Sequence, residues 1–422
     1  MKIAVIGAGI SGLVVAYKLQ AKHEVTVFEA NDYIGGHTNT IDVVQEDQHL
    51  AIDTGFIVFN DRTYPNFQKL LSEWNVDYQK TEMSFSVKCD RTGLEYRGAD
   101  FNGLFAQRSN LFNPSYLRLL YDLVRFKKVA SPLLHQNEDP ETVESFLNRH
   151  KFSIQFIEQY FIPMGSAIWS CPRGVFLNFP IQFIAEFYHH HGLLGVSDRP
   201  QWFVIKGGSR EYVRKLTSLL HCNVNLNSPV ASVSRNDHSV LLSLPLYDKS
   251  FDHVVFACHA DQSLRILGQQ ATESEREILA AFPYQKNVAT LHTQTSVLPK
   301  TKRAWAAWNY HRPIEESKNA TVTYNMNILQ SLRTNKTYNV TLNDDGQIND
   351  ENIIKQIQYA HPIFNLRRKE MQLRHNELIN SARTSFCGAY WGNGFHEDGV
   401  NSGLSVTEQL INLCPSTAVP NA

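Results

Sequence analysis

The sequence predicts an α/β fold with two domains, and three observations support this prediction. The chain has 422 residues, which is more than one ordinary core needs and enough for two. Its start reads as a buried strand at 2–6, a helix at 11–22 and a valine-rich strand at 24–29. Strands that can return to the same sheet follow much later, at 251–258 and 385–389. The first domain is therefore predicted to be a parallel sheet built from distant segments.

A glycine-rich turn joins the first strand to the helix. It reads Gly7-Ala8-Gly9-Ile10-Ser11-Gly12, and Glu29 stands at the end of the next strand. In this context Gly7 allows a tight turn, Gly9 lets the backbone approach a pyrophosphate, and Gly12 lets the helix meet the strand. Glu29 can accept hydrogen bonds from ribose hydroxyls. The pattern predicts a Rossmann-type dinucleotide-binding unit more strongly than a glycine turn without a ligand.

The rest of the chain alternates between the first domain and a second one. Residues 101–134 and 141–161 have apolar side chains at helical spacing and predict an α-rich insert. A helix at 210–220, a strand at 222–233 and a final helix at 399–413 complete the first domain. The sheet of the second domain is predicted from strands at 287–294, 304–309, 321–326 and 338–342. We assign residues 1–75, 205–262 and 380–422 to the first domain, and 76–204 and 263–379 to the second.

Charge and cysteine content exclude several classes of function. The formal net charge is -1, so no global field attracts nucleic acid. The six cysteines include no CxxC pair, which argues against a zinc ribbon or a disulfide framework and favours a reducing, cytoplasmic setting. We also expect no secretion signal and no membrane-spanning segment, because no apolar run is long enough.

Several further blocks resemble the flavin-containing amine oxidase superfamily, which includes monoamine oxidases, protoporphyrinogen oxidase and phytoene desaturase. They are Glu29-Ala30, Ile34-Gly35-Gly36-His37, Asp53-Thr54-Gly55-Phe56 and the closing run from Phe386 to Gly399. Within the superfamily the chain is most similar to a bacterial group known only as NAD/FAD-binding proteins. The resemblance implies a Rossmann-type, GR2-like FAD-binding domain with a discontinuous α+β substrate domain, and FAD held without a covalent bond.

The resemblance also implies which residues contact the cofactor. The usual residue after Gly35-Gly36 is Arg, and here it is His37, so the phosphate contact is expected to be weaker. A helix N-terminus in the closing run can stabilise negative charge on the reduced flavin. The implied cofactor-binding residues are Gly7, Gly9, Ile10, Ser11, Gly12, Glu29, Ala30, Gly35, Gly36, His37, Gly55, Phe56, Ile57, Val230, Gly388, Phe395, His396, Glu397 and Val400.

Few catalytic side chains are expected, because a flavin performs the redox step. Phe395 matches a position where amine oxidases place an aromatic ring beside the flavin. Tyr390, Trp391, Trp308 and Tyr310 are candidates for the wall of the same cavity, with core packing as the alternative. Lys286 lies near a position where amine oxidases carry a lysine linked to the flavin through water, with a solvated lysine as the alternative.

Two other segments have compositions typical of binding sites. His189-His190-His191 are consecutive, so their side chains point in different directions around a helix, and we predict no metal site. Residues 108–128 interleave aromatic and leucine residues with Arg118, Arg125, Lys127 and Lys128, which is typical of a helix on an anionic membrane and also of a helix that packs between domains. Peripheral contact with the inner face of the membrane is therefore left open.

Three functions fit these features. The leading hypothesis is an FAD-dependent desaturase or oxidase that removes hydride from an acyl or isoprenoid lipid, because aromatic residues are abundant and the superfamily includes desaturases. The second is a flavin amine oxidase, in which Lys286 becomes important. The third is a carrier of the same fold that binds lipids without catalysis. The substrate, the electron acceptor, any role of NAD(P)H and the oligomeric state stay open.

Overall fold

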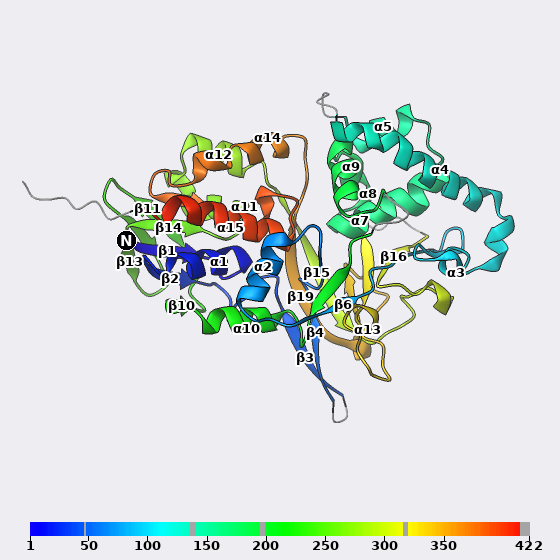
Figure 1. Cartoon of the computed structure of the whole chain (residues 1–422), viewed down its shortest axis with the longest axis horizontal. Coiled ribbons are helices and arrows are strands. Elements are labelled where there is room, and N and C mark those ends of the chain that lie inside the picture. The colour runs from blue at the N-terminus through cyan, green and yellow to red at the C-terminus, as the bar shows by residue number, and fades with distance from the viewer. Residues whose placement is uncertain (46–47, 136–140, 195–198, 315–319, 414–422) are drawn as a thin grey trace, which may run out of the picture.

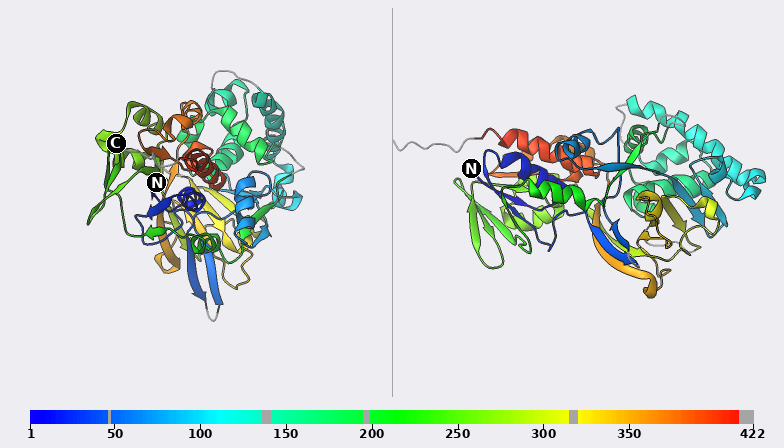
Figure 2. Two further views of the ribbon diagram at one scale, coloured as in Figure 1. Left: turned by 60° about the vertical axis from the view of Figure 1, so that its left-hand side comes forward. Right: turned by 60° about the horizontal axis from the view of Figure 1, so that its bottom comes forward.

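The computed structural model describes residues 1–45, 48–135, 141–194, 199–314 and 320–413. They form a parallel-sheet domain, a second and larger sheet, and a helical lobe packed against that second sheet (Figure 1). The parallel-sheet domain and the helical lobe lie at opposite ends of the molecule (Figure 2).

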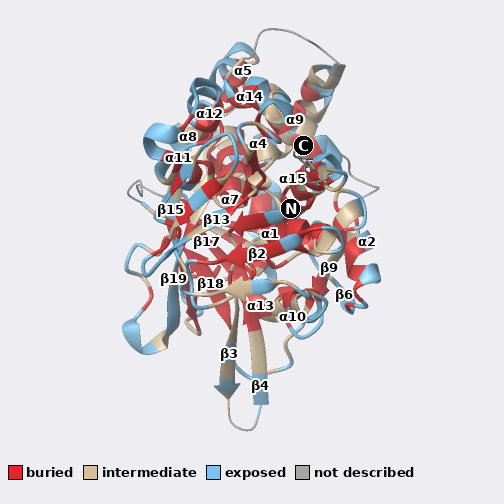
Figure 3. Ribbon diagram, turned by 90° about the vertical axis from the view of Figure 1, so that its left-hand side faces the viewer, coloured by how far each residue is buried: buried red, intermediate tan, exposed pale blue. Residues whose placement is uncertain are grey.

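The first domain is built on a five-stranded sheet in the order β10-β2-β1-β14-β20, and every pairing is parallel. Its strands are β1 (Lys2–Ile6), β2 (Glu24–Phe28), β10 (Asn223–Asn225), β14 (His253–Phe256) and β20 (Thr384–Phe386). Four of the five residues of β1 and of β2 are buried, as parallel strands covered on both faces require (Figure 3). The strands come from all three segments that the sequence assigned to this domain.

Helices cover one face of this sheet. They are α1 (Ile10–Leu19), α10 (Arg210–Ser218) and α15 (His396–Leu410), and α1 packs along α15. The other face carries a small antiparallel sheet of β11 (Ser232–Arg235), β12 (Val240–Ser243) and β13 (Asp248–Phe251), together with α11 (Ala260–Leu267), α12 (Glu273–Leu279) and α14 (Arg368–Leu373). The parallel sheet is therefore covered on both faces, and the carboxyl ends of β1, β2 and β14 lie together at one of its edges. Ligands bind at this edge in folds of this kind.

The second sheet has seven strands in the order β19-β15-β18-β17-β16-β7-β8. Its strands are β7 (Phe85–Cys89), β8 (Leu94–Arg97), β15 (Tyr284–His292), β16 (Trp308–Arg312), β17 (Thr321–Asn325), β18 (Asn339–Leu342) and β19 (Ile353–Pro362). The short helix α13 (Met326–Leu329) follows β17. All pairings are antiparallel except the one between β16 and β7.

The helical lobe packs against this sheet. Its helices are α3 (Phe101–Leu104), α4 (Pro114–Ala130), α5 (Val143–Arg149), α6 (Ile154–Phe156), α7 (Ile162–Trp169), α8 (Arg173–Leu177) and α9 (Ile181–His190). Its core is rich in aromatic rings, with Phe126, Phe156 and Phe161 in mutual contact. The strands β5 (Phe59–Asn60), β9 (Trp202–Ile205) and β6 (Tyr78–Thr81) form a small sheet, and helix α2 (Pro65–Glu73) lies between β5 and β6 in the chain. The hairpin of β3 (Thr40–Gln45) and β4 (Gln48–Asp53) projects from the molecule (Figure 3).

Two predicted strands differ from the observed ones, and strand β19 was not predicted. The strand expected at 222–233 is two short strands, β10 and β11, which belong to different sheets. The strand expected at 304–309 begins at Trp308, because a single 3-10 turn occupies Lys302–Ala304. Strand β19 shows no clear alternation of apolar and polar residues in the sequence, because it contains glutamine, lysine and histidine.

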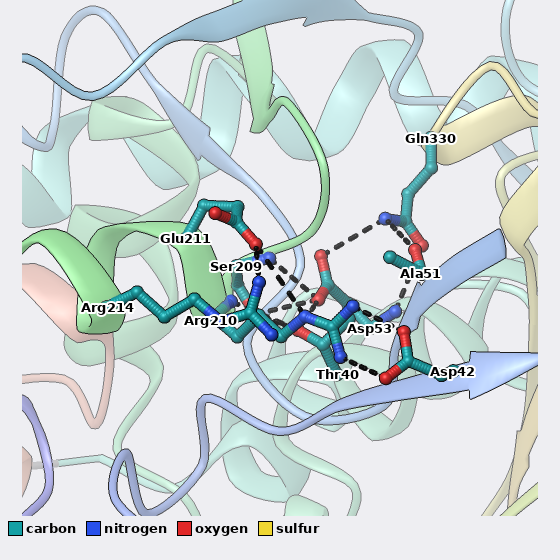
Figure 4. A network of polar contacts seen from close by, with 9 residues as sticks. All are labelled: Thr40, Asp42, Ala51, Asp53, Ser209, Arg210, Glu211, Arg214 and Gln330. Atoms are coloured by element: carbon teal, nitrogen blue, oxygen red, sulfur yellow. Dashed lines mark hydrogen bonds and ion pairs between the residues drawn. The ribbon is translucent and has the colours of Figure 1, made fainter. Parts of the chain in front are cut away.

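Asp53 connects three parts of the structure (Figure 4). Its Oδ1 atom accepts hydrogen bonds from Thr40 Oγ1 at 2.6 Å and from the backbone N and Oγ of Ser209, both at 2.8 Å. Gln330, which follows α13, donates to Oδ2 at 3.3 Å. Burial raises the pKa of Asp53 to about 6, although these hydrogen bonds oppose the shift. One carboxyl group thus joins the hairpin, the start of α10 and the second sheet.

An Asp53→Ala variant is expected to lose about 3 kcal/mol of unfolding free energy, because several buried donors lose their acceptor. Asp42→Ala is the matched control. Asp42 pairs with Arg210 in the same network, but its side chain is 61% exposed, so its loss is expected to cost less than about 1 kcal/mol. Denaturant unfolding of both variants checks this, and equal effects would contradict the bridging role.

Candidate functional site

The glycine turn after β1 forms a cradle at the start of α1. A Cβ atom at Gly12 would lie 2.1 Å from the carbonyl oxygen of Gly7, and one at Gly7, whose φ is +108°, would lie 2.8 Å from that of Ala257. These two positions are thus restricted to glycine by their surroundings. At Gly9 a Cβ atom would meet no other described atom within 4 Å. The backbone at Gly9 therefore faces open space in front of a helix N-terminus, which fits an anionic pyrophosphate.

The second glycine pair lies against this cradle. The backbone N of Gly35 donates to the carbonyl of Ala8 at 2.9 Å, and Gly9 and Gly35 form a parallel bridge. A Cβ atom at Gly36 would lie 3.2 Å from Cα of Gly9. The turn from Gly7 to Gly12 and the Gly35-Gly36 pair, which are well separated in the sequence, thus form one continuous backbone surface.

Glu29 borders the cradle at the end of β2. Its Oε2 atom accepts from the backbone N of Ala8 at 2.8 Å, and its Oε1 atom accepts from the backbone N of Asn31 at 2.9 Å. Ser228, two residues before the buried Val230, donates its N–H to the carbonyl of Glu29 at 2.8 Å. The structure therefore brings Glu29 and the Val230 segment together, as the expected adenosine site requires. Their contact with a nucleotide stays a prediction, as does that of the exposed Ala30.

His37 lies in a cluster of rings where the two sheets meet. Its ring stacks on Tyr359 with centroids 5.1 Å apart, and the rings of His361 and His259 lie 5.6 Å and 5.9 Å away. Asn287 approaches His361 at 2.9 Å. Burial lowers the pKa of His37 and brings those of His259 and His361 to about 3, so these rings are neutral near pH 7.

The sequence analysis missed the residues that join His37 in this cluster. For His259 a signal existed, because it follows the predicted strand at 251–258 and so lies at the carboxyl edge of the parallel sheet. His361 and Tyr359 come from β19, the strand that the pattern did not reveal.

The closing run begins α15 beside α1. A Cβ atom at Gly399 would lie 2.9 Å from both Ile10 Cγ2 and Ser11 Oγ, so the first turns of the two helices are in close contact. Val400 is fully buried, and the backbone N of Gly388 donates to Ser402 Oγ at 2.9 Å. Two helix N-termini therefore start at the same edge of the parallel sheet, which places two positive dipole ends near the cradle.

The side chain of His396 is engaged within the protein. Its ring stacks on Phe56 with centroids 3.7 Å apart, and Nε2 lies 2.7 Å from the hydroxyl of Tyr212. Burial lowers its pKa to about 3. The ring thus holds Phe56 against α15. A contact between His396 and a flavin would therefore be made by the backbone of His396. Beside Phe56, Gly55 packs on the carbonyl of His37 and Ile57 enters the core of the second sheet, and the flavin contact predicted for this segment stays a prediction.

Glu397 and Asp398 act as helix caps. The two oxygens of Glu397 accept from the backbone N of Asn66 at 2.9 Å and of Phe67 at 2.8 Å, at the start of α2. Asp398 accepts from the backbone N of Phe395 at 2.8 Å, at the start of its own helix. The two carboxylates thus cap the N-termini of α2 and α15. Both oxygens of Glu397 accept hydrogen bonds from α2, as both oxygens of Glu29 accept from backbone N–H groups, so cofactor contact by either carboxylate would use the remaining lone pairs and stays a prediction.

Phe395 faces the helical lobe, as do two other predicted aromatic residues. Its ring stacks on Phe187 of α9 with centroids 5.2 Å apart. Trp308 and Tyr310 share one face of β16 with Arg312, whose guanidinium pairs with Glu158 of the lobe at 2.6 Å. These residues thus line the boundary between the second sheet and the lobe, and Phe395 extends that boundary to the start of α15.

Three catalytic candidates need correction. Tyr390 is 1% exposed and packs on Phe282, and Trp391 stacks on His375 with centroids 4.0 Å apart. The ring of Tyr390 is therefore part of the core of the first domain, and the half-buried ring of Trp391 packs against that core. Lys286 is exposed on β15, and strand alternation places it opposite Asn287, which is the residue that approaches His361. The arrangement is that of a solvated lysine.

The three consecutive histidines do not converge. His191 is buried and stacks on Phe187 at 3.8 Å, whereas His189 and His190 are exposed at the end of α9. Among the described residues, no three side chains of His, Cys, Asp or Glu are placed to hold a metal ion.

The fold and the cradle define a flavin-dependent oxidoreductase, and comparisons with known proteins agree. Residues 10–309 match the model of the flavin containing amine oxidoreductase family. The chain belongs to this family.

Solved structures with the same fold share little sequence with the chain. A protein provisionally assigned as a protoporphyrinogen oxidase from Exiguobacterium sp. 255-15 has a TM-score of 0.71 and 14% identity, over 97% of this chain and 98% of that one. A fatty acid isomerase from P. acnes, which produces CLA, has a TM-score of 0.69 and 13% identity over 96% and 98%. Cyclohexylamine oxidase from Brevibacterium oxydans IH-35A has a TM-score of 0.67 and 16% identity over 97% and 99%.

A short segment of the chain is similar to a desaturase. The 4,4'-diapophytoene desaturase of Staphylococcus aureus strain Newman is 52% identical over 42 residues. These residues are 10% of this chain and 8% of the relative, so the match spans a small part of either protein.

Proposed function

We propose that the protein holds FAD without a covalent bond and removes hydride from a hydrophobic substrate, an acyl or isoprenoid lipid. The observation that carries the cofactor assignment is the open backbone at Gly9, flanked by the N-termini of α1 and α15 and by Glu29. This arrangement suits a dinucleotide with a pyrophosphate in its middle better than a mononucleotide. A bound flavin supplies the two-electron acceptor.

The residues of the chain have binding and orienting roles in this proposal. The Gly7 to Gly12 turn holds the pyrophosphate through backbone N–H groups, and Glu29 accepts from the ribose. The His37 cluster lies at the border between the two sheets and is neutral, so it contributes hydrogen bonds rather than fixed charge. Phe395 positions the substrate from the start of α15, and the aromatic lobe excludes water.

The boundary between the second sheet and the lobe favours an apolar substrate. Phe395, Trp308 and Tyr310 all face it, and the lobe core behind it is mostly aromatic. Among solved structures of this fold is a fatty acid isomerase, and the short sequence match is to a desaturase of an isoprenoid lipid. Lys286, which an amine oxidase mechanism would use, is exposed and points away from the His37 cluster.

The proposal is tested by mixing flavin-loaded protein with separated lipid and amine fractions without oxygen. Bleaching of the oxidised flavin band by a lipid fraction is the expected result, since reduction removes that absorption. Phe395→Ala is expected to slow the bleaching about tenfold or more, because the substrate loses a positioning surface. Lys286→Met serves as the control and is expected to leave the rate unchanged. Bleaching by amines alone, lost in Lys286→Met, would establish the amine oxidase instead.

A further inference from the structure

Helix α4 has two contrasting faces. Tyr116, Leu119 and Phe126 point into the lobe and are buried. On the opposite face Leu117, Tyr121 and Val124 are 43%, 60% and 67% exposed. Their spacing of four and three residues places them in one stripe along the helix. The outer surface of α4 is therefore apolar, although it is not covered by another described part of the chain.

The apolar stripe continues beyond the start of the helix. Leu111 and Phe112 lie in the 3-10 turn Arg108–Phe112 that leads into α4, and they are 37% and 86% exposed. Phe101, at the start of α3, is 63% exposed. Single exposed apolar residues are normal on a protein surface, but a run of them along one helix and its leading turn marks a binding surface.

Positive charge surrounds this stripe. Lys128 continues it by one turn, and Arg118 and Arg125 flank it on one side. The only acidic residue between Phe101 and Ala130 is Asp122, against five basic ones, whereas the whole chain has a net charge of -1. Asp122 is fully buried and pairs with Arg118 at 3.2 Å and with Arg125 at 3.4 Å. The exposed charged side chains of α4 are therefore all basic, and the buried Asp122 partly neutralises Arg118 and Arg125.

We propose that the face formed by Leu111, Phe112, Leu117, Tyr121, Val124 and Lys128 binds the surface of an anionic membrane. Apolar side chains on such a helix enter the boundary between headgroups and acyl chains, and the arginine and lysine side chains meet the lipid phosphates. The charge pattern favours lipid over a second copy of the chain, since two such faces would repel each other. No helix among the described residues is long and apolar enough to cross a bilayer, so the contact is peripheral.

This inference deepens the proposed function by naming the place from which a lipid substrate is taken, and its substrate aspect depends on that function. The helix belongs to the same lobe that carries α9, against which Phe395 stacks. Binding to the membrane surface itself is independent of the chemistry.

The test is flotation of the flavin-loaded protein with vesicles of phosphatidylcholine alone or with added phosphatidylglycerol. We expect binding only to the anionic vesicles, and weaker binding as salt is raised. The variant Phe112→Ser/Tyr121→Ser/Val124→Ser is expected to lose at least about tenfold in affinity, and Lys128→Glu to lose a smaller part. The matched control is Leu246→Ser/Leu373→Ser, because these leucines are 92% and 80% exposed elsewhere on the surface. It is expected to bind like the natural protein.

Other results would overturn the proposal. Equal binding to both vesicle types, absence of binding, or equal loss in the leucine control would each contradict it. A natural protein that is a dimer in solution, and a triple variant that is a monomer, would show that a second copy covers this face. The flavin spectrum confirms that each variant is folded. Flavin reduction by lipid dispersed in detergent is measured in parallel, so that failure of membrane binding is distinguished from failure of the proposed function.

Discussion

A Gly9→Ala variant is expected to fold normally and to bind flavin at least about tenfold more weakly, which corresponds to about 1.4 kcal/mol. Gly9 has a φ of -76°, which alanine adopts without strain, and its Cβ atom would meet no described atom within 4 Å. The new methyl group would instead occupy the space assigned to the pyrophosphate. Fluorescence titration of flavin-free protein with FAD measures the affinity, and thermal unfolding without FAD measures the stability.

Gly12→Ala is the matched comparison for this cradle. Its Cβ atom would lie 2.1 Å from the carbonyl of Gly7, so the helix must move away from the strand. This variant is expected to lose about 1–3 kcal/mol of stability as well as flavin affinity. If Gly9→Ala retained the natural affinity for FAD, the pyrophosphate would not lie in the cradle.

Four buried histidines, offset in part by two buried carboxyl groups, are expected to reduce the unfolding free energy by roughly 5 kcal/mol between pH 7 and pH 5, and His259, His361 and His375 add to this loss. Burial lowers the pKa of His253 and His396 to about 3 and that of His191 and His292 to about 4. Below pH 6.5 the unfolded chain binds protons at these histidines and the folded chain does not, so stability is lost as the pH falls. The carboxyl groups of Asp53 and Asp398 offset part of this loss of stability.

The two buried carboxyl groups change the unfolding free energy in the opposite direction. Burial raises the pKa of Asp53 and Asp398 to about 6, so their contribution is present at low pH and is lost as the pH rises through 6. Their effect between pH 7 and 5 is smaller than that of the histidines. Denaturant unfolding at both pH values checks the net loss. His253→Asn, far from the cradle beside Ser385, is expected to reduce the loss by about 2 kcal/mol, and a stability independent of pH would contradict the account.

The fold was largely predictable because its first domain is marked by local patterns. The strand before Gly7, the glycine turn and the valines of β2 specify a βαβ unit within 30 residues, and all three were found close to their true bounds. The hairpin from Thr40 to Asp53 and the strand β19 were not predicted. Their polar residues are paired across the sheet, and pairing between distant segments leaves no periodic signal in one sequence.

The candidate site was predictable in its backbone and less so in its side chains. Glycines at 7, 12 and 35 are required by the close approach of chain segments, and such requirements are visible in a sequence. The roles of His396 and Glu397 were not visible, because their partners Tyr212, Phe56 and the start of α2 are brought near only by the fold. Tyr390 and Trp391 are residue types that often line a cavity, but Tyr390 lies in the core and Trp391 packs against it.

The most direct test of the central claim is to unfold the purified, flavin-loaded protein and identify the released cofactor by its mass and visible spectrum. The cradle at Gly9 and the site beside Glu29 predict one FAD per chain, released without a covalent bond to the protein. Release of FMN, or a protein that contains no flavin and takes up no FAD, would contradict the account.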